Sequence, residues 1–148
     1  MSNMKYKDKL IVGALEKCCL PDLQIEGLET RIDTGAQTSS LHVDNIVEYR
    51  KEGRKWIEFF IHPDVHNVDT IVKCHAKVKA LRKIKSSSGC IQKRYIIETT
   101  IVIGPKKWRI EVSLSDRSNM TYLMLLGREA MVGNIIVSPG ENFLQSPR

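Results

Sequence analysis

The residues best suited to chemistry form the tetrapeptide Asp33-Thr34-Gly35-Ala36. It stands where an apolar stretch ending at Ile32 gives way to a hydroxyl-rich segment, so the pattern predicts an aspartate in a glycine-containing loop after a strand. Two carboxylates that share one proton can cleave a peptide bond, because one activates water as a base while the other polarises the carbonyl. One chain supplies only one such loop. Asp and Gly after a strand also occur in ordinary turns, so the tetrapeptide needs support from elsewhere in the chain.

A second motif, Leu125-Leu126-Gly127-Arg128, follows much later in the chain. The residues of the two motifs and their order resemble those of the retropepsins, the single-domain dimeric aspartic proteases. In that family an apolar-apolar-Gly segment passes beneath the Asp-Thr-Gly loop, and its glycine lets two backbones approach closely. The resemblance therefore implies that Leu126, Gly127 and Arg128 support the site.

The chain is still more similar to a bacterial retropepsin-like group known as ATP-dependent zinc proteases. This resemblance rests on the run from Arg31 to His42, on Arg94-Tyr95 and on the Leu-Leu-Gly-Arg motif, and it extends roughly from residue 11 to residue 143. It implies a mainly β fold, a closed retropepsin-like barrel with one short helix after the Leu-Leu-Gly-Arg motif. It also implies a homodimer in which each chain contributes one Asp33.

The same resemblance assigns roles around the first motif. Asp33 would be the catalytic carboxylate, Thr34 would fix the turn by hydrogen bonding, and Gly35 would provide the backbone geometry. Ala36 and Gln37 would line the substrate pocket. Retroviral enzymes carry a second aspartate at the position of Gln37, and that aspartate pairs with the arginine of the Gly-Arg step.

Because Gln37 carries no charge, Arg128 is expected to find another carboxylate. The candidates are Glu129, Asp44 and Asp116.

The segment Ser86-Ser87-Ser88-Gly89 lies between two basic, strand-like runs and is the candidate cover over a substrate cleft. A surface loop without a role fits this segment equally well. We expect Ser86, Ser87, Ser88 and Gly89 to contact substrate.

Alternating apolar and β-branched residues predict a mainly β chain. The expected strands span residues 9–13, 23–27, 56–61, 70–74, 95–103 and 108–114. The last two form a hairpin with Gly104-Pro105 near its tip. A short helix is expected over residues 128–132, before Gly133-Asn134.

Length and composition are typical of one globular unit. We expect a single retropepsin-like domain over residues 1–148, with a disordered N-terminus at 1–8 and a loose C-terminus at 144–148. No apolar run reaches the length of a membrane span, so no membrane partner is expected. The lysine-rich N-terminus argues against a signal peptide, and four cysteines fit reduced thiols. The expected location is the cytoplasm.

The chain carries a net charge of +6, and its basic residues concentrate between Lys73 and Arg94. Such a cluster can bind nucleic acid or attract an acidic peptide, although solvated strand faces joined by a basic loop explain it as well. No aromatic residues interleave with these charges as a base-stacking surface requires. We therefore expect no nucleic-acid partner.

A zinc site would need about three converging nitrogen, sulfur or oxygen donors. The chain contains donors at His42, His62, His66, His75, Cys74 and Cys90, but it lacks a His-Glu-x-x-His motif. Pro63 also argues against one helix through His62 and His66. A phosphate-cradling glycine loop is missing too, so we expect neither a metal nor another cofactor.

The leading hypothesis is a retropepsin-like aspartic peptidase that uses an Asp33 dyad in a homodimer. The alternative is a non-catalytic module of the same fold that binds peptide or protein, and a zinc-dependent protease ranks third. Because similar proteins are associated with ATP-grasp ligases that add glutamate to proteins, the resemblance makes such a ligase a candidate partner.

Overall fold

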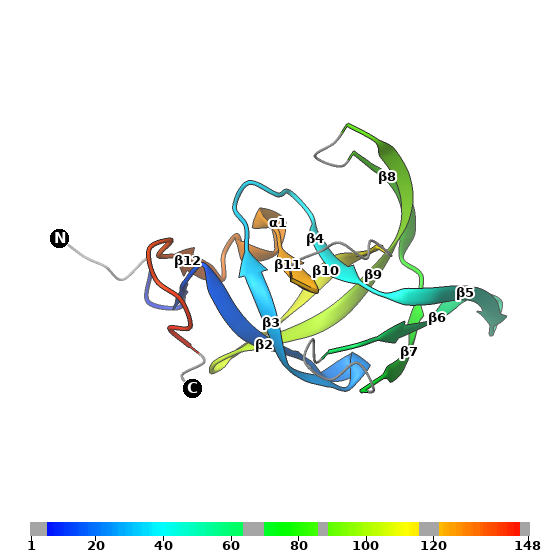
Figure 1. Cartoon of the computed structure of the whole chain (residues 1–148), viewed down its shortest axis with the longest axis horizontal. Coiled ribbons are helices and arrows are strands. Elements are labelled where there is room, and N and C mark those ends of the chain that lie inside the picture. Colours follow the sequence, from blue (N-terminus) through cyan, green and yellow to red (C-terminus); the bar gives the residue numbers. More distant parts are fainter. Residues whose placement is uncertain (1–5, 64–69, 86–88, 116–121, 146–148) are drawn as a thin grey trace.

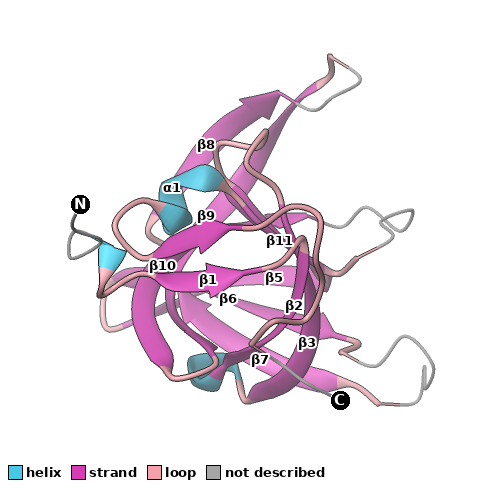
Figure 2. Cartoon of the chain, turned by 90° about the vertical axis from the view of Figure 1, so that its left-hand side faces the viewer, coloured by secondary structure: helices cyan, strands magenta, loops and turns pink. Residues whose placement is uncertain are grey.

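A closed β-barrel forms the centre of the molecule (Figure 2). The computed structural model describes residues 6–63, 70–85, 89–115 and 122–145. Six strands follow one another around the barrel in the order β10-β4-β11-β3-β2-β9, and antiparallel pairing of β9 with β10 closes it. These strands are β2 (Leu15–Leu20), β3 (Ile25–Ile32), β4 (Ser39–His42), β9 (Ile91–Ile103), β10 (Lys106–Ser115) and β11 (Met124–Leu126).

The alternation of buried and exposed residues explains why these strands pack one face on a common core. In β9 the side chains of Ile97, Thr99, Ile101 and Ile103 are fully or almost fully buried, at every second position, as expected of a strand with one face on a core. Gly104-Pro105 connects β9 to β10 directly, because Ile103 pairs with Lys106 across the turn. The predicted hairpin is therefore present.

A second sheet packs against the barrel, at the right of Figure 1. It contains β5 (Asp44–Lys51), β6 (Arg54–Ile61) and β7 (Val72–Lys77) in that order. The side chains of Ile57 and Phe59 are completely buried and belong to the same hydrophobic core as the barrel strands. The two sheets therefore share one core.

An arm projects from the barrel, at the top of Figures 1 and 2. It consists of β8 (Ala80–Lys85) paired antiparallel with the first half of β9, from Lys85 opposite Ile91 to Ala80 opposite Ile96. We call these two paired segments the β8–β9 arm. Gly89, with φ of +88°, precedes β9, whereas Ser86, Ser87 and Ser88 of the predicted cover lie outside the described residues.

The remaining elements are short. The 3-10 helix η2 (Pro21–Leu23) joins β2 to β3, and α1 (Arg128–Met131) follows β11 directly, within the segment predicted to be helical. β1 (Leu10–Val12) pairs in parallel with β12 (Ile135–Val137) as a separate two-stranded sheet. Within the described residues, no helix is long and apolar enough to cross a membrane.

A buried carboxylate holds the C-terminal segment to the barrel. Glu16 has no exposed surface, and its two oxygens accept backbone N–H groups from Gly13 at 2.8 Å, Leu144 at 2.8 Å and Gln145 at 3.0 Å. A buried charge is tolerated only when it is paired or hydrogen-bonded in this way. Leu144 and Gln145 belong to the segment predicted to be loose, and the structure gives them these partners.

The fold prediction is confirmed in its main terms: the protein is mainly β, its barrel is closed, and one short α-helix follows the Leu-Leu-Gly-Arg motif. Six strands, β2, β4, β5, β8, β11 and β12, are additional to the strands predicted from the pattern.

Candidate active site

Asp33 is the first residue after β3, and its loop is held by its own backbone and by β11. Its N–H donates to the carbonyl oxygen of Leu126 at 2.9 Å, and its carbonyl oxygen accepts the N–H of Ala36 at 3.2 Å. The N–H of Gly35 donates to Asp33 Oδ1 at 3.0 Å. The turn therefore orients the carboxylate, and Asp33 as a residue is half-buried.

The second motif lies directly beside this loop. β11 pairs in parallel with β3, and the last residue pair is Leu126 with Ile32. Gly127 of the second motif and Asp33 of the first each follow this pair directly. The N–H of Gly127 donates to Ser39 Oγ at 3.0 Å. The parallel pairing of β11 with β3 thus brings together two motifs that lie far apart in the sequence.

Gly127 sits where a side chain has no room. A Cβ atom at this position would lie 2.6 Å from the carbonyl carbon of Thr38, 2.8 Å from the carbonyl oxygen of Gln37 and 2.9 Å from the nitrogen of Ser39. All three are backbone atoms of the segment that follows the Asp33 loop. Because its φ of −89° suits any residue, glycine is required here for close approach and not for conformation.

Arg128 stabilises the loop through carbonyl oxygens, which differs from the expected carboxylate partner. Its Nη1 lies 3.4 Å from the carbonyl oxygen of Thr34 and 3.3 Å from that of Gly35, and its N–H donates to the carbonyl oxygen of Ala36 at 2.8 Å. Thr34 thus contributes to the loop through its backbone. An exposed guanidinium can satisfy carbonyls at the turn without a charged partner.

Two of the three carboxylates considered for Arg128 have other partners. Glu129 Oε1 accepts the hydroxyl of Thr38 at 3.4 Å. Asp44 lies beside two imidazoles, at 3.7 Å from His42 Nε2 and 3.2 Å from His62 Nε2. Asp116 lies outside the described residues.

An open cleft of about 770 Å³ extends from Asp33 to the β8–β9 arm. Four of its lining residues are cations, all from the arm, so it combines a carboxylate loop on one side with positive charge on the other. The lining residues are Asp33, Gly35, Ala36, Gln37, Thr38, Ser40, Arg82, Lys83, Ile84, Lys85, Arg94, Ser113, Leu125 and Glu129. Of the predicted substrate-contacting residues, Ala36 and Gln37 are in this lining and Gly89 is not.

The cations of the arm were not among the site residues predicted from the sequence. Arg94 is only 6% exposed, and its Nε and Nη2 lie 3.3 and 3.2 Å from Gln92 Oε1. Arg82 and Arg94 are cross-strand partners and therefore project from the same face of the arm, which faces the cleft. The basic cluster between residues 73 and 94 was the available signal, but it carried no information about which face each charge would occupy.

Ion pairs fasten the base of the arm to the barrel. Lys79 Nζ lies 3.0 Å from Glu98 Oε2 and 2.8 Å from Glu111 Oε2, and Arg82 Nη1 lies 2.9 Å from Glu111 Oε1. The hydrogen bond from Lys79 is the main cause that lowers the pKa of the Glu111 carboxyl, and those from Lys79 and Arg109 lower the pKa of Glu98. Glu111 therefore links two cations of the arm to β10.

Replacing Glu111 with glutamine should loosen the arm at neutral pH without unfolding the barrel, because Lys79 and Arg82 lose one ionic partner. Amide hydrogen exchange of residues 80–85 should accelerate several-fold. Glu26→Gln serves as the control, because it makes the same chemical change at an exposed residue outside the arm. Since a lowered carboxyl pKa contributes stability above the unfolded value near 4.3 and loses it as pH falls, acidification should loosen the wild-type arm in the same way. Unchanged exchange in Glu111→Gln would show that these pairs do not hold the arm.

The residues in the described part of the chain do not provide a zinc site. No group of three or more His, Cys, Asp or Glu side chains there is arranged to hold a metal ion. His66, one of the donors considered from the sequence, lies outside the described residues.

Several solved and curated proteins resemble this chain. A crystal structure of a Legionella pneumophila protein of unknown function aligns with a TM-score of 0.77 and 30% sequence identity, covering 92% of this chain and 98% of that one. A Shewanella halifaxensis protein with the name "Probable alpha-L-glutamate ligase" is 43% identical over 136 residues, and a Desulfotalea psychrophila protein of the same name is 41% identical over 131 residues. These alignments cover 92% and 88% of this chain but only 30% and 28% of the two relatives, so the chain spans less than a third of their length.

A family model described as retropepsin-like aspartic endopeptidase RimB matches residues 11–148. The match includes both motifs that meet at the Asp33 loop, the barrel that positions them and the arm above the cleft. The chain therefore belongs to the RimB-like family of retropepsin-like aspartic endopeptidases.

Proposed function

We propose that this protein is an aspartic peptidase that hydrolyses peptide bonds with two Asp33 carboxylates, one from each chain of a homodimer. The observation that carries the proposal is the position of Asp33, which is half-buried in a hydrogen-bonded turn and lines an open cleft. Two such carboxylates would hold one water between them. One would take a proton from the water as it attacks the scissile carbonyl, and the other would donate a proton to the carbonyl oxygen.

The free edge of β12 supports a symmetric dimer. Leu10 N–H donates to the carbonyl oxygen of Asn134, and Ser138 N–H donates to that of Val12, so the alternate backbone groups of Ile135 and Val137 point away from β1. Among the described strands only β1 pairs with β12. An open strand edge is a template for pairing, and a second copy could add its own β12 there.

The opposite edge of this small sheet is already occupied. Gly13 N–H donates to Glu16 Oε2, and the carbonyl oxygen of Ile11 accepts Gln145 Nε2 at 2.8 Å. Strand pairing between two copies would therefore use β12 and not β1.

Mixing wild-type chains with Asp33→Asn chains tests the shared dyad. With an equal amount of Asp33→Asn chain added to a fixed amount of wild type, random exchange leaves about half of the wild-type chains in homodimers, so activity should fall to about half. A second variant carries Val137→Pro in addition to Asp33→Asn, and the proline removes an N–H from the free edge of β12. Chains of this double variant should not lower the activity of the wild type, because they no longer pair with it. Activity that is independent of the added chain would contradict a dyad made from two copies.

The charge of the cleft supports an acidic peptide as substrate. Arg82, Lys83, Lys85 and Arg94 line it from the arm, and the acids Asp33 and Glu129 belong to the same lining. Long-range attraction of a negatively charged chain to such a surface raises its rate of association. The relatives named as glutamate ligases carry a matching segment within a longer chain, which supports a working link between this domain and a ligase that adds glutamate.

A non-catalytic module that binds peptide or protein is the second candidate. The specific observation in its favour is Gln37, which lines the cleft without a charge, while Arg128 contacts carbonyl oxygens. The two candidates make opposite predictions for Asp33→Asn: the peptidase loses product formation, whereas the binding module keeps its full function.

A further inference from the structure

The outer face of the β5–β6–β7 sheet combines aromatic rings with lysines. Alternate residues of the three strands share this side, because Tyr49 pairs with Trp56 and Trp56 with Lys77, while Phe60 pairs with Lys73. The residues between them on β6, Ile57 and Phe59, point into the core and are fully buried. We call this outer side the aromatic face; it contains Asp44, Val47, Tyr49, Lys51, Arg54, Trp56, Glu58, Phe60, Lys73, His75 and Lys77.

Three rings of the aromatic face lie next to one another. The Tyr49 hydroxyl is 3.0 Å from His75 Nδ1, and the two rings pack edge to face with centroids 6.0 Å apart. Trp56 lies directly opposite Tyr49, and Lys51 Nζ is 4.8 Å from the centre of the Trp56 ring. The Tyr49 and Trp56 side chains are half-buried and His75 is exposed, so the sheet fixes the rings while leaving surface for a ligand.

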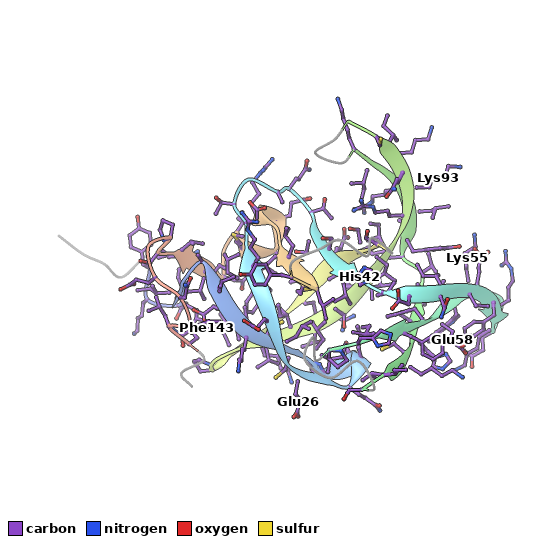
Figure 3. All side chains as sticks on the ribbon, viewed as in Figure 1. Glu26, His42, Lys55, Glu58, Lys93 and Phe143 are labelled. Atoms are coloured by element: carbon purple, nitrogen blue, oxygen red, sulfur yellow. The ribbon has the colours of Figure 1, made fainter. Side chains whose placement is uncertain are left out.

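The charge of this face favours an anion. Lys51, Lys73 and Lys77 are exposed, and the face contains two carboxylates. Glu58 is 3.4 Å from Lys73 Nζ, and Asp44, the partner of Phe60, is 3.2 Å from His62 Nε2. Figure 3 shows Glu58 on this sheet, at the side of the molecule away from β1 and β12. The three lysines therefore outnumber the two acids.

A hollow of about 580 Å³ adjoins the rings. Trp56, His75 and Lys77 of the aromatic face line it. The other charged residues of its lining are Arg54, Lys79, Arg109, Asp22 and Glu98. Trp56 thus borders both Lys51 and a space large enough for a planar ring.

We propose that the aromatic face binds single-stranded nucleic acid, an activity separate from peptide hydrolysis. Bases stack on the Trp56 and Tyr49 rings, and Lys51, Lys73 and Lys77 contact the phosphates, the combination that such surfaces use. The lysines of β7 by themselves did not indicate nucleic-acid binding, because no aromatic residues lie among them in the sequence. The tertiary fold supplies the missing aromatic residues from β5 and β6.

The first test measures binding of a fluorescent oligouridylate by anisotropy. Wild-type protein should bind it, with an affinity that falls steeply between about 50 and 200 mM salt. The double variant Lys73→Glu, Lys77→Glu should bind about tenfold or more weakly. The matched control Lys93→Glu, Lys107→Glu makes the same change in net charge on other surfaces, and Figure 3 shows Lys93 on the arm. Equal loss in both double variants would overturn the proposal, because general attraction to a basic protein would then explain binding.

The second test asks whether a base stacks on Trp56. Since the chain has two tryptophans, Trp108→Phe leaves Trp56 as the only one, and its fluorescence should be quenched on addition of oligouridylate. Trp56→Leu, checked for folding by circular dichroism, should lower affinity about tenfold. Absence of quenching, or equally tight competition by an oligoglutamate peptide of the same charge, would overturn the nucleic-acid proposal, and the latter result would assign the face to acidic protein segments.

Discussion

Replacing Asp33 with asparagine is expected to reduce peptide hydrolysis by at least about a thousandfold while leaving the protein folded. The amide cannot take a proton from water or return one, and positioned acid–base groups contribute about 10²- to 10⁴-fold to such reactions. The fold should persist because the contact of Gly35 N–H with Asp33 Oδ1 needs only an acceptor, which the asparagine carbonyl oxygen also supplies. Cleavage of an acidic fluorogenic peptide and circular dichroism measure the two effects.

Asp8→Asn provides the matched control for this variant. It makes the same chemical change at an exposed position, and it should retain wild-type activity. If purified Asp33→Asn keeps full activity, the aspartic mechanism is wrong. If instead it loses activity together with its near-ultraviolet dichroism, Asp33 has a structural role that the loop geometry does not reveal.

Replacing Gly127 with valine should give the largest loss of stability among the changes considered. The Cβ would overlap the backbone of Gln37, Thr38 and Ser39, and backbone cannot move aside as the end of a side chain can. Overpacking of this kind costs about 1–3 kcal/mol or more, which corresponds to a fall of roughly 3–15 °C in the unfolding midpoint for a domain of this size. Gly127→Ala should show a smaller effect of the same sign.

Gly140→Ala is the control for the glycine series, because a Cβ at residue 140 meets no atom within 4 Å. Its midpoint should remain within about one degree of wild type. Thermal unfolding of the three variants at the same concentration measures the comparison. A wild-type midpoint for Gly127→Val would mean that β11 does not pass close to the segment after Asp33.

Local sequence pattern was sufficient for the elements with clear alternation. β9, β10 and their turn were predictable because apolar residues recur at every second position and Gly104-Pro105 interrupts them. The strands that were missed are β2, β4, β5, β8, β11 and β12, because their partners determine them. In β2, for example, Glu16 breaks the apolar pattern, and it is buried only because backbone N–H groups from distant residues reach it.

The two motifs and their order, and with them the family, could be recognised from the residues alone, since Asp33 and Gly127 are identifiable from their immediate neighbours. The predominance of β structure was also predictable, because alternation is a local property of the chain. What surrounds the motifs depends on tertiary packing: Arg128 contacts carbonyl oxygens, Arg82 and Arg94 face the cleft, and rings from β5 and β6 meet the lysines of β7. These contacts join residues that lie far apart in the chain. Strand register sets the face on which each side chain lies, and register depends on the packing of the whole barrel and its neighbouring sheet.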